Sequence, residues 1–272
     1  GGSSMSELAV RASSWGEIFD CGYRWEGKNL LGMRLPAGLR TVLGSAIHAA
    51  TAAFDQSVID GSGVTVDDAA GVLVDKLRDP GEECDFSRDD LTPKEAESIG
   101  ITLLSRYCRE WSPRFEFRYV EMATTPLTID CGGGVVIRLT GTMDRARVYA
   151  DSGSVGIKDL KSGARAVEKG GAKTRGHAAQ IGTYELLYEH TTGERPTAPA
   201  GIIGLKTSGK PEIATGEITG ARELMVGTDD HKGLIEFAAI MFRTGLFTPN
   251  PSSILCGERY CPRYGVCRYR SR

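Results

Sequence analysis

The sequence predicts a mixed α/β fold of the α+β kind, in which a central mixed sheet is flanked by helices. In the N-terminal third, apolar residues recur at helical spacing, as at Leu43, Ile47, Phe54 and Val58. Between residues 115 and 160, short apolar runs alternate with glycine-rich turns, which is the pattern of strands. Because a further helical pattern follows these strands, we expect helices on both sides of the sheet.

Composition limits the class of protein. The chain has 272 residues, of which 40% are hydrophobic and 25% charged, enough for one large domain or two small ones. We find no signal peptide and no apolar run near the ~18 residues of a membrane span, so we expect a cytoplasmic protein with no membrane partner. The net charge of −2 is not that of a protein coated in basic groups, so nucleic-acid binding would need a local patch.

The N-terminal part is predicted to be helical. We expect four helices: from Ser13 or Ser14 to about Tyr23, from the loop that ends at Gly38 to about Ile59, from Val66 to Leu77, and from Thr92 to about Trp111. Thr92-Pro93-Lys94-Glu95 has the residue types of a capping box. His48 lies beside the apolar stripe of the second helix, and taken alone it is more often a half-buried structural histidine than a metal ligand.

The strand region is predicted to be an antiparallel meander whose strand ends deliver two acids, Asp144 and Asp159. Its strands are expected from Phe115 through Ile129, with a possible break, and at Val135–Thr142, Asp144–Tyr149 and Val155–Leu160. Glu121, on the first strand, is either a further acid near the site or an ordinary surface glutamate. Ala200–Lys206 and Glu212–Glu217 are expected to form a buried strand and its partner, and a helix to begin at Thr228 or Asp229.

Asp159 and Lys161 share one face of a strand, because alternate residues of a strand point to the same side. Alone, such a pair is more often a solvated ion pair that adds little stability. Here the preceding run is apolar, and a second acid, Asp144, ends a neighbouring run. Two carboxylates with a nearby ammonium can hold a hard divalent cation and stabilise charge on a phosphate oxygen.

A basic, glycine-rich segment follows at residues 163–176, and we expect a mobile loop near the site. Its cations suit contacts with DNA phosphates, although a solvated charged face is the simpler alternative; they are Arg165, Lys169, Lys173 and Arg175. The next helix, about Arg175 to His190, places His177, Gln180 and Tyr184 on one face. A plain polar helix face would show the same spacing.

The C-terminal tail, after a linker at residues 248–252, carries a second strong signal. Cys256, Cys261 and Cys267 lie within twelve residues, and thiolates bind zinc or an iron–sulfur cluster, both of which usually take four ligands. Reduced cysteines that bind no metal are the alternative. Four further cysteines are scattered along the chain, and a disulfide framework is not expected in a cytoplasmic protein.

Four separated motifs resemble those of one known family. They are Gly44-Ser-Ala-Ile-His48, Gly141-Thr-Met-Asp144, Asp159-Leu160-Lys161 and Gln180-x-x-x-Tyr184. Together they resemble the motifs of the PD-(D/E)xK nuclease superfamily, in its RecB-type exonuclease branch. This branch includes the CRISPR-associated RecB-like nucleases. The resemblance spans residues 13–267. It implies a restriction-endonuclease-like core and a DNA substrate.

The resemblance also implies roles for individual residues. His48, Asp144, Asp159 and the Leu160 carbonyl would hold Mg²⁺ or Mn²⁺, Lys161 would act in catalysis, and Gln180 and Tyr184 would position the strand. Some nucleases of this type join one N-terminal cysteine to three C-terminal ones around a [4Fe–4S] cluster, which makes Cys21 the expected fourth ligand and Cys131 a weaker candidate. Gly22 and the wide Cys256–Cys261 spacing depart from the family pattern, so Zn²⁺ stays open for this site.

The sequence therefore predicts a metal-dependent DNA exonuclease that acts on single strands or DNA ends. The alternatives are an endonuclease of the same superfamily and a non-catalytic DNA-binding module with an iron–sulfur or zinc site. Partner proteins from recombination, repair or CRISPR adaptation are all compatible with it. We expect one intertwined unit made of a helical region (residues 5–112), a nuclease core (113–247) and a cysteine tail (248–272) that closes on Cys21.

Overall fold

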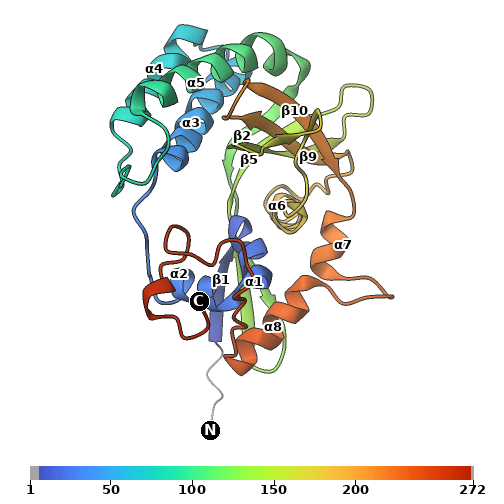
Figure 1. Ribbon diagram of the computed structural model, residues 1–272. Coiled ribbons are helices and arrows are strands. Elements are labelled where there is room, and N and C mark those ends of the chain that lie inside the picture. Colours follow the sequence, from blue (N-terminus) through green and yellow to red (C-terminus); the bar gives the residue numbers. More distant parts are fainter. Residues whose placement is uncertain (1–5, 271–272) are drawn as a thin grey trace.

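The computed structural model describes residues 6–270, and its centre is a mixed five-stranded sheet (Figure 1). The strand order is β10-β9-β6-β5-β2. The strands are Glu116–Ala123 (β2), Thr142–Val148 (β5), Val155–Gly163 (β6), Ala200–Lys206 (β9) and Glu212–Ile218 (β10). β6 runs parallel to β9, and the other neighbours pair antiparallel. The mixed sheet flanked by helices is the predicted fold class, which is confirmed.

The two faces of this sheet are buried in separate apolar cores. β9 sends Ile202 into one core and Ile203 into the other, as the alternation of side chains along a strand requires. Helix α6 (Ala178–Thr192) covers the first face and makes the crossover that a parallel β6–β9 pair needs. The crossover places α6 against β6, where Gln180 lies beside Asp159.

The second face is covered by three helices that the sequence predicts well. They are α3 (Leu39–Asp60), α4 (Val66–Arg78) and α5 (Pro93–Arg106), and α5 continues into a π-helical turn at Tyr107–Trp111. The capping box at Thr92 and Glu95 is present, with a second one at Thr65 and Asp68. Leu43 and Ile47 of α3 pack with Leu160 of β6, which fixes α3 across the sheet.

The predicted meander is wrong in one respect, because part of it forms a second sheet. Leu127–Asp130 (β3) and Val135–Thr140 (β4) pair with each other, and Ser6–Arg11 (β1) adds to β4 in parallel. The chain passes from this sheet to the central one at Gly141. A side chain there would meet the ring of Tyr184 at 2.9 Å, so the close approach requires glycine.

Three other boundaries differ from prediction. The first helix is two helices, α1 (Trp15–Asp20) and α2 (Gly22–Asn29), because Cys21 between them is extended. The last helix, α8 (Leu234–Thr244), begins later than Thr228 or Asp229, after a short helix α7 (Ala221–Val226) and a tight turn. The segment expected as a mobile loop contains a small hairpin, β7 (Val167–Glu168) with β8 (Gly171–Ala172). Short 3-10 turns lie at Ala12–Ser14, Ser112–Arg114 and Tyr264–Val266.

The C-terminal tail lies beside α1 and α2, so both ends of the described chain meet (Figure 1). Arg263 of the tail pairs with Glu26 of α2 at 2.8 Å and stacks over Tyr23. A side chain at Gly27 would overlap Arg263, which explains the glycine. Among the described helices, none combines the length and apolar character that crossing a membrane requires.

Candidate active site

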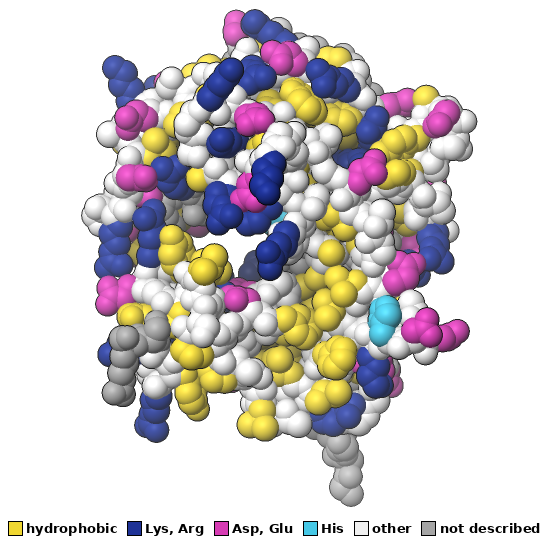
Figure 2. All heavy atoms as spheres, turned by 45° about the vertical axis from the view of Figure 1, so that its right-hand side comes forward, with side chains coloured by type: hydrophobic (Ala, Val, Ile, Leu, Met, Phe, Trp, Pro, Cys, Tyr) yellow, Lys and Arg dark blue, Asp and Glu magenta, His cyan; other side chains and the backbone are white. Residues whose placement is uncertain are grey.

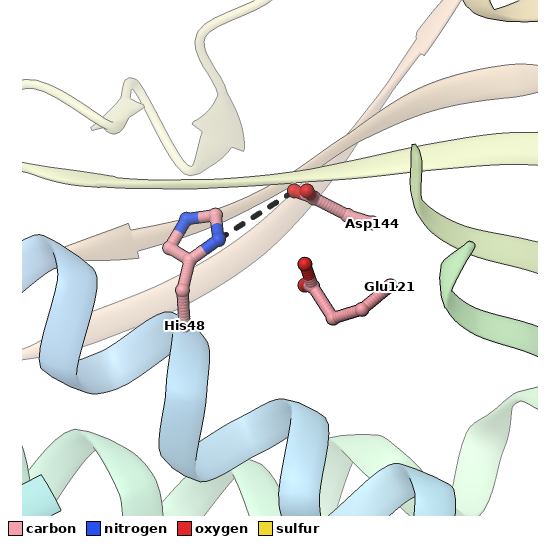
Figure 3. A group of neighbouring side chains, drawn as sticks. All are labelled: His48, Glu121 and Asp144. Carbon is pink, nitrogen blue, oxygen red and sulfur yellow. Dashed lines mark ion pairs between the residues drawn. The ribbon is translucent and has the colours of Figure 1, made fainter. Parts of the chain in front are cut away.

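Three side chains from different elements converge on one point in front of the sheet (Figure 3). His48 comes from α3, Glu121 from β2 and Asp144 from β5, and their ligand atoms all lie within 4.8 Å of one another. His48 Nδ1 is 3.6 Å from Asp144 Oδ2. Two carboxylates and an imidazole at such distances form a candidate cation site.

Glu121 reaches this point through an unusual backbone. Its φ is 48°, in the left-handed region that residues other than glycine rarely adopt, and the register of β2 against β5 shifts between Phe117 and Tyr119. Irregularities of this kind re-aim side chains next to functional sites. The sequence could not choose between a site acid and a surface glutamate, because the period-two pattern of a strand does not show such a distortion.

Asp159 and Lys161 lie directly beside these three groups. Lys161 Nζ is 2.6 Å from Asp159 Oδ2. Asp144 Oδ2 accepts a hydrogen bond from the Leu160 amide at 2.8 Å, which ties β5 to β6 across the site. The structure therefore brings together the two predicted acids, the lysine and His48. It also places Glu121 next to His48 and Asp144, which the sequence left open.

The electrostatics of the site favour a bound cation. Burial and then the Asp144 charge raise the pKa of Asp159 to about 6, against the opposing effect of Lys161. Burial and then Glu121 raise the pKa of Asp144. Burial lowers the pKa of His48 to about 4, so its imidazole is neutral at pH 7 and has a lone pair to donate. A divalent ion would offset the repulsion among these acids.

The donors also have free coordination capacity. Asp159 is 1% exposed, and its Oδ2 is paired with Lys161 Nζ at 2.6 Å. A carboxylate oxygen has two lone pairs, so this pairing leaves one of them for a metal ion. Carboxylate oxygens with one neutral imidazole are ligands that Mg²⁺ and Mn²⁺ accept. The residues present therefore fit a divalent metal.

Helix α6 supports the site from behind. Gln180 Nε2 donates to Asp159 Oδ1 and lies within hydrogen-bond distance of the Tyr184 hydroxyl, both at 3.3 Å. Tyr184 is only 4% exposed, and burial raises the pKa of its hydroxyl, so it stays a neutral phenol. The predicted face of α6 is thus directed at the acids. Gln180 contacts them, and Tyr184 is too buried to reach a substrate directly.

A pocket leads to the acids along the N-terminal half of α3. Arg40, Thr41, Ser45 and His48 line it on one side, and Glu121 and Lys161 on the other. A side chain at Gly44 would meet Ser162 Oγ at 2.9 Å, so this glycine lets α3 approach β6 closely. In Figure 2 the molecule is visibly hollowed between its upper and lower parts, with Lys and Arg side chains along the rim of the hollow.

Comparison with known proteins decides the family. A model of the PD-(D/E)XK nuclease superfamily matches residues 12–268, which is nearly the whole chain. The protein belongs to the PD-(D/E)XK nuclease superfamily. A crystal structure of a protein from Eubacterium rectale, described as a putative exonuclease, has the same fold with a TM-score of 0.55 and 15% sequence identity. That similarity covers 97% of this chain and 90% of the other. No curated protein matches the chain significantly.

Membership of the superfamily implies a nucleic-acid substrate and a divalent metal at the acids.

The four cations predicted to contact DNA phosphates do not lie at the acids. Arg165 is exposed and paired with Glu168 at 2.8 Å, and Lys169 and Arg175 are also exposed, whereas Lys173 is half-buried. None of these four described cations lines the pocket at the acids. They flank the hairpin and the start of α6, so any contact they make lies outside the immediate site.

The cysteines of the two chain ends meet in one pocket of this nuclease. Cys21, Cys256, Cys261 and Cys267 all line it, together with Arg24 and Tyr264. Burial raises the pKa of Cys261, and Cys21 and Cys267 contribute in the same direction. Cys131 lies elsewhere, with its Sγ 3.6 Å from the Ile129 carbonyl, and is not part of this group. Four thiols around one cavity fit a metal centre with four ligands.

Proposed function

We propose that this protein is a metal-dependent DNA exonuclease of the RecB-type branch, which hydrolyses phosphodiester bonds in single-stranded DNA or at DNA ends. The observation that carries the proposal is the meeting of His48, Glu121 and Asp144 beside the Asp159–Lys161 pair. A non-catalytic DNA-binding module would not need a lysine paired with a buried aspartate beside two further carboxylates. Superfamily membership supports the hydrolytic chemistry.

Each residue has a role in this proposal. The ligands of Mg²⁺ or Mn²⁺ would be His48, Glu121, Asp144, Asp159 and the Leu160 carbonyl. When bound, the ion lowers the pKa of a water molecule and offsets charge on phosphate oxygens. Lys161, 27% exposed, orients the attacking water or stabilises negative charge as it develops in the transition state. Gln180 fixes the Asp159 carboxylate, and Tyr184 holds Gln180 and so positions the strand indirectly.

Access to the acids favours a flexible substrate. The acids lie in a pocket walled by α3 on one side and by Glu121 and Lys161 of the central sheet on the other. Duplex DNA is stiff over about 150 base pairs, whereas a single strand or frayed end bends into a recess at low cost. Arg165, Lys169, Lys173 and Arg175 would then contact phosphates of the strand as it leaves the pocket.

We also propose that Cys21, Cys256, Cys261 and Cys267 hold a [4Fe–4S] cluster, with Zn²⁺ as the alternative. Support comes from their shared pocket and from the origin of the thiols at both ends of the chain. When bound, the centre links these ends covalently through its metal–sulfur bonds. No residue of this pocket belongs to the acid site, so the role we assign is structural. Iron and sulfide analysis, set against zinc analysis, distinguishes the two metals.

An endonuclease of the same superfamily is the nearest alternative, and substrate topology separates the two. An exonuclease requires a free end, so we expect cleavage of linear single-stranded DNA with Mn²⁺ and none of the same sequence as a covalently closed circle. Equal cleavage of both forms would identify an endonuclease.

We also propose that the protein works in the cytoplasm, together with proteins of DNA recombination, repair or CRISPR adaptation.

A further inference from the structure

We propose that Arg145 and Asp55 form a buried positioning unit that fixes the three ligand-bearing elements of the metal site relative to one another. The inference rests on the proposed function, because it assigns these residues to the geometry of its metal ligands. Neither residue faces the pocket at the acids. Arg145 is 0% exposed and Asp55 is 1% exposed.

Arg145 belongs to β5, and its guanidinium contacts the two other elements that supply candidate ligands, α3 and β2. Arg145 Nε donates to Asp55 Oδ2 of α3 at 2.8 Å, and Nη1 donates to the Asp144 carbonyl of β5 at 2.8 Å. Nη1 also lies 3.4 Å from Glu121 Oε1 of β2. The planar fork of arginine allows these contacts in several directions at once, and the single ammonium of a lysine could not make them together.

Asp55 anchors this guanidinium firmly to α3. Its two carboxylate oxygens also accept hydrogen bonds from the Tyr107 hydroxyl and the Ser112 hydroxyl, each at 2.7 Å. Asp55 lies seven residues after His48, so the two residues are on the same face of the helix. Anchoring Asp55 therefore sets both the rotation of α3 and the height of His48 above the sheet.

The location of the unit argues for a role beyond stability. A buried ion pair is weak evidence for stability, because apolar residues of similar volume often serve as well. This one lies directly behind the acids, where Arg145 bonds the Asp144 carbonyl and approaches the Glu121 carboxylate. It also contacts the side chain whose backbone, at φ 48°, is strained. Residues behind metal ligands commonly set metal affinity through such contacts.

The test is the Mn²⁺ affinity of the full-length protein, measured by electron paramagnetic resonance titration without DNA. We expect Arg145→Lys to weaken Mn²⁺ binding ~10–100-fold. Asp55→Asn should weaken it less, because the amide keeps the shape. The control is Arg222→Lys, since Arg222 bonds the Glu189 carboxylate and lines neither the pocket at the acids nor the cysteine pocket. It should lose stability but keep the wild-type Mn²⁺ affinity.

A double-mutant cycle separates positioning from folding. If Arg145 acts partly through Glu121, the Mn²⁺ penalty of Arg145→Lys shrinks in a Glu121→Gln background. Should Arg145→Lys fail to fold, Tyr107→Phe offers a milder change, because it removes one hydroxyl from Asp55; we then expect a smaller loss of Mn²⁺ affinity in the folded variant. A folded Arg145→Lys protein with wild-type Mn²⁺ affinity would overturn the inference. If that variant does not fold, the inference is overturned when folded Asp55→Asn and Tyr107→Phe both keep the wild-type Mn²⁺ affinity. Failure of the wild-type protein to bind Mn²⁺ would instead overturn the proposed function.

Discussion

Glu121 and Asp159 show how the surroundings of a single side chain decide its chemistry. Both are acids on strands, and sequence patterns treat them alike. Asp159 is 1% exposed, and burial raises its pKa to about 6. Glu121 is more exposed, but its left-handed backbone aims the carboxylate at His48 and Asp144. Burial and backbone geometry are both tertiary properties, so the local sequence could rank these acids only through the motifs around them.

Glu185, on α6 away from the acids, gives a prediction about pH. Burial and then Glu223 raise its pKa to about 7 from 4.5. The folded protein therefore holds this proton more tightly than the unfolded chain, so its contribution to stability is full below pH 4.5 and is lost as pH rises through 7. We expect Glu185→Gln to raise the free energy of unfolding by on the order of 2 kcal/mol at pH 8 and hardly at all at pH 4.

Denaturant unfolding of the two proteins at pH 4 and pH 8 measures this difference. If Glu185→Gln raised the free energy of unfolding equally at pH 4 and pH 8, the raised pKa of Glu185 would not be the cause of the gain in stability. A destabilised Glu185→Gln at pH 8 would show instead that the ionised carboxylate is stabilised by Arg222.

At the scale of elements, the approach of α3 to β6 places His48 over the acids. Gly44 makes this approach possible, because a side chain there would meet Ser162 Oγ at 2.9 Å. We expect Gly44→Val to displace α3, to cost about 1–3 kcal/mol of stability, and to lower cleavage at least tenfold. Adding Ser162→Ala should restore part of both, since it removes the blocking hydroxyl. Unfolding free energy and cleavage rate are the measurements.

Gly71→Ala on α4 is the matched control, since a side chain there meets open space. It should stabilise the protein by about 0.5–1 kcal/mol and leave cleavage unchanged, because alanine favours the helix. If Gly44→Val behaved like this control, the close approach of α3 to β6 would have no role in placing His48.

Elements with strong local signals were predictable, and those defined by distant partners were not. The period of apolar residues and the Thr92 cap identified α3, α4 and α5 almost to the residue. Strand β1 has no distinctive pattern and exists because β4 pairs with it across more than 120 residues. The division of the strands at Gly141 likewise depends on the ring of Tyr184, which is remote in sequence.

The site was predictable to a similar degree. His48, Asp144, Asp159 and Lys161 lie in recognisable motifs, and the structure brings them together. Arg145 and Asp55 lie beside or between those motifs, but their pairing over 90 residues has no signature in a single sequence. The functional roles of His48, Asp144, Asp159 and Lys161 stay predictions, and so does the positioning role of Arg145 and Asp55.

At the scale of the whole molecule, the tail joins the two ends of the chain through the cysteine pocket. We expect Cys261→Ala to lose most bound iron and to melt at a lower temperature, because a centre that binds only the folded state stabilises it. Cys84→Ala, outside the pocket, is the control and should keep its iron and its melting temperature. A Cys261→Ala protein with wild-type iron content would contradict the proposed ligand set. The three-part organisation of the chain stays a prediction.

The central claim is that Lys161 and a divalent metal together cleave DNA. The most direct measurement is cleavage of end-labelled single-stranded DNA by the wild-type protein and by Lys161→Ala, with Mn²⁺ and with EDTA, alongside DNA affinity for both proteins. We predict cleavage by the wild-type protein with Mn²⁺ alone, loss of at least a hundredfold in Lys161→Ala, and nearly equal DNA affinity. A wild-type protein that binds DNA but does not cleave it with Mn²⁺, or a Lys161→Ala variant that cleaves at the wild-type rate, would contradict the claim.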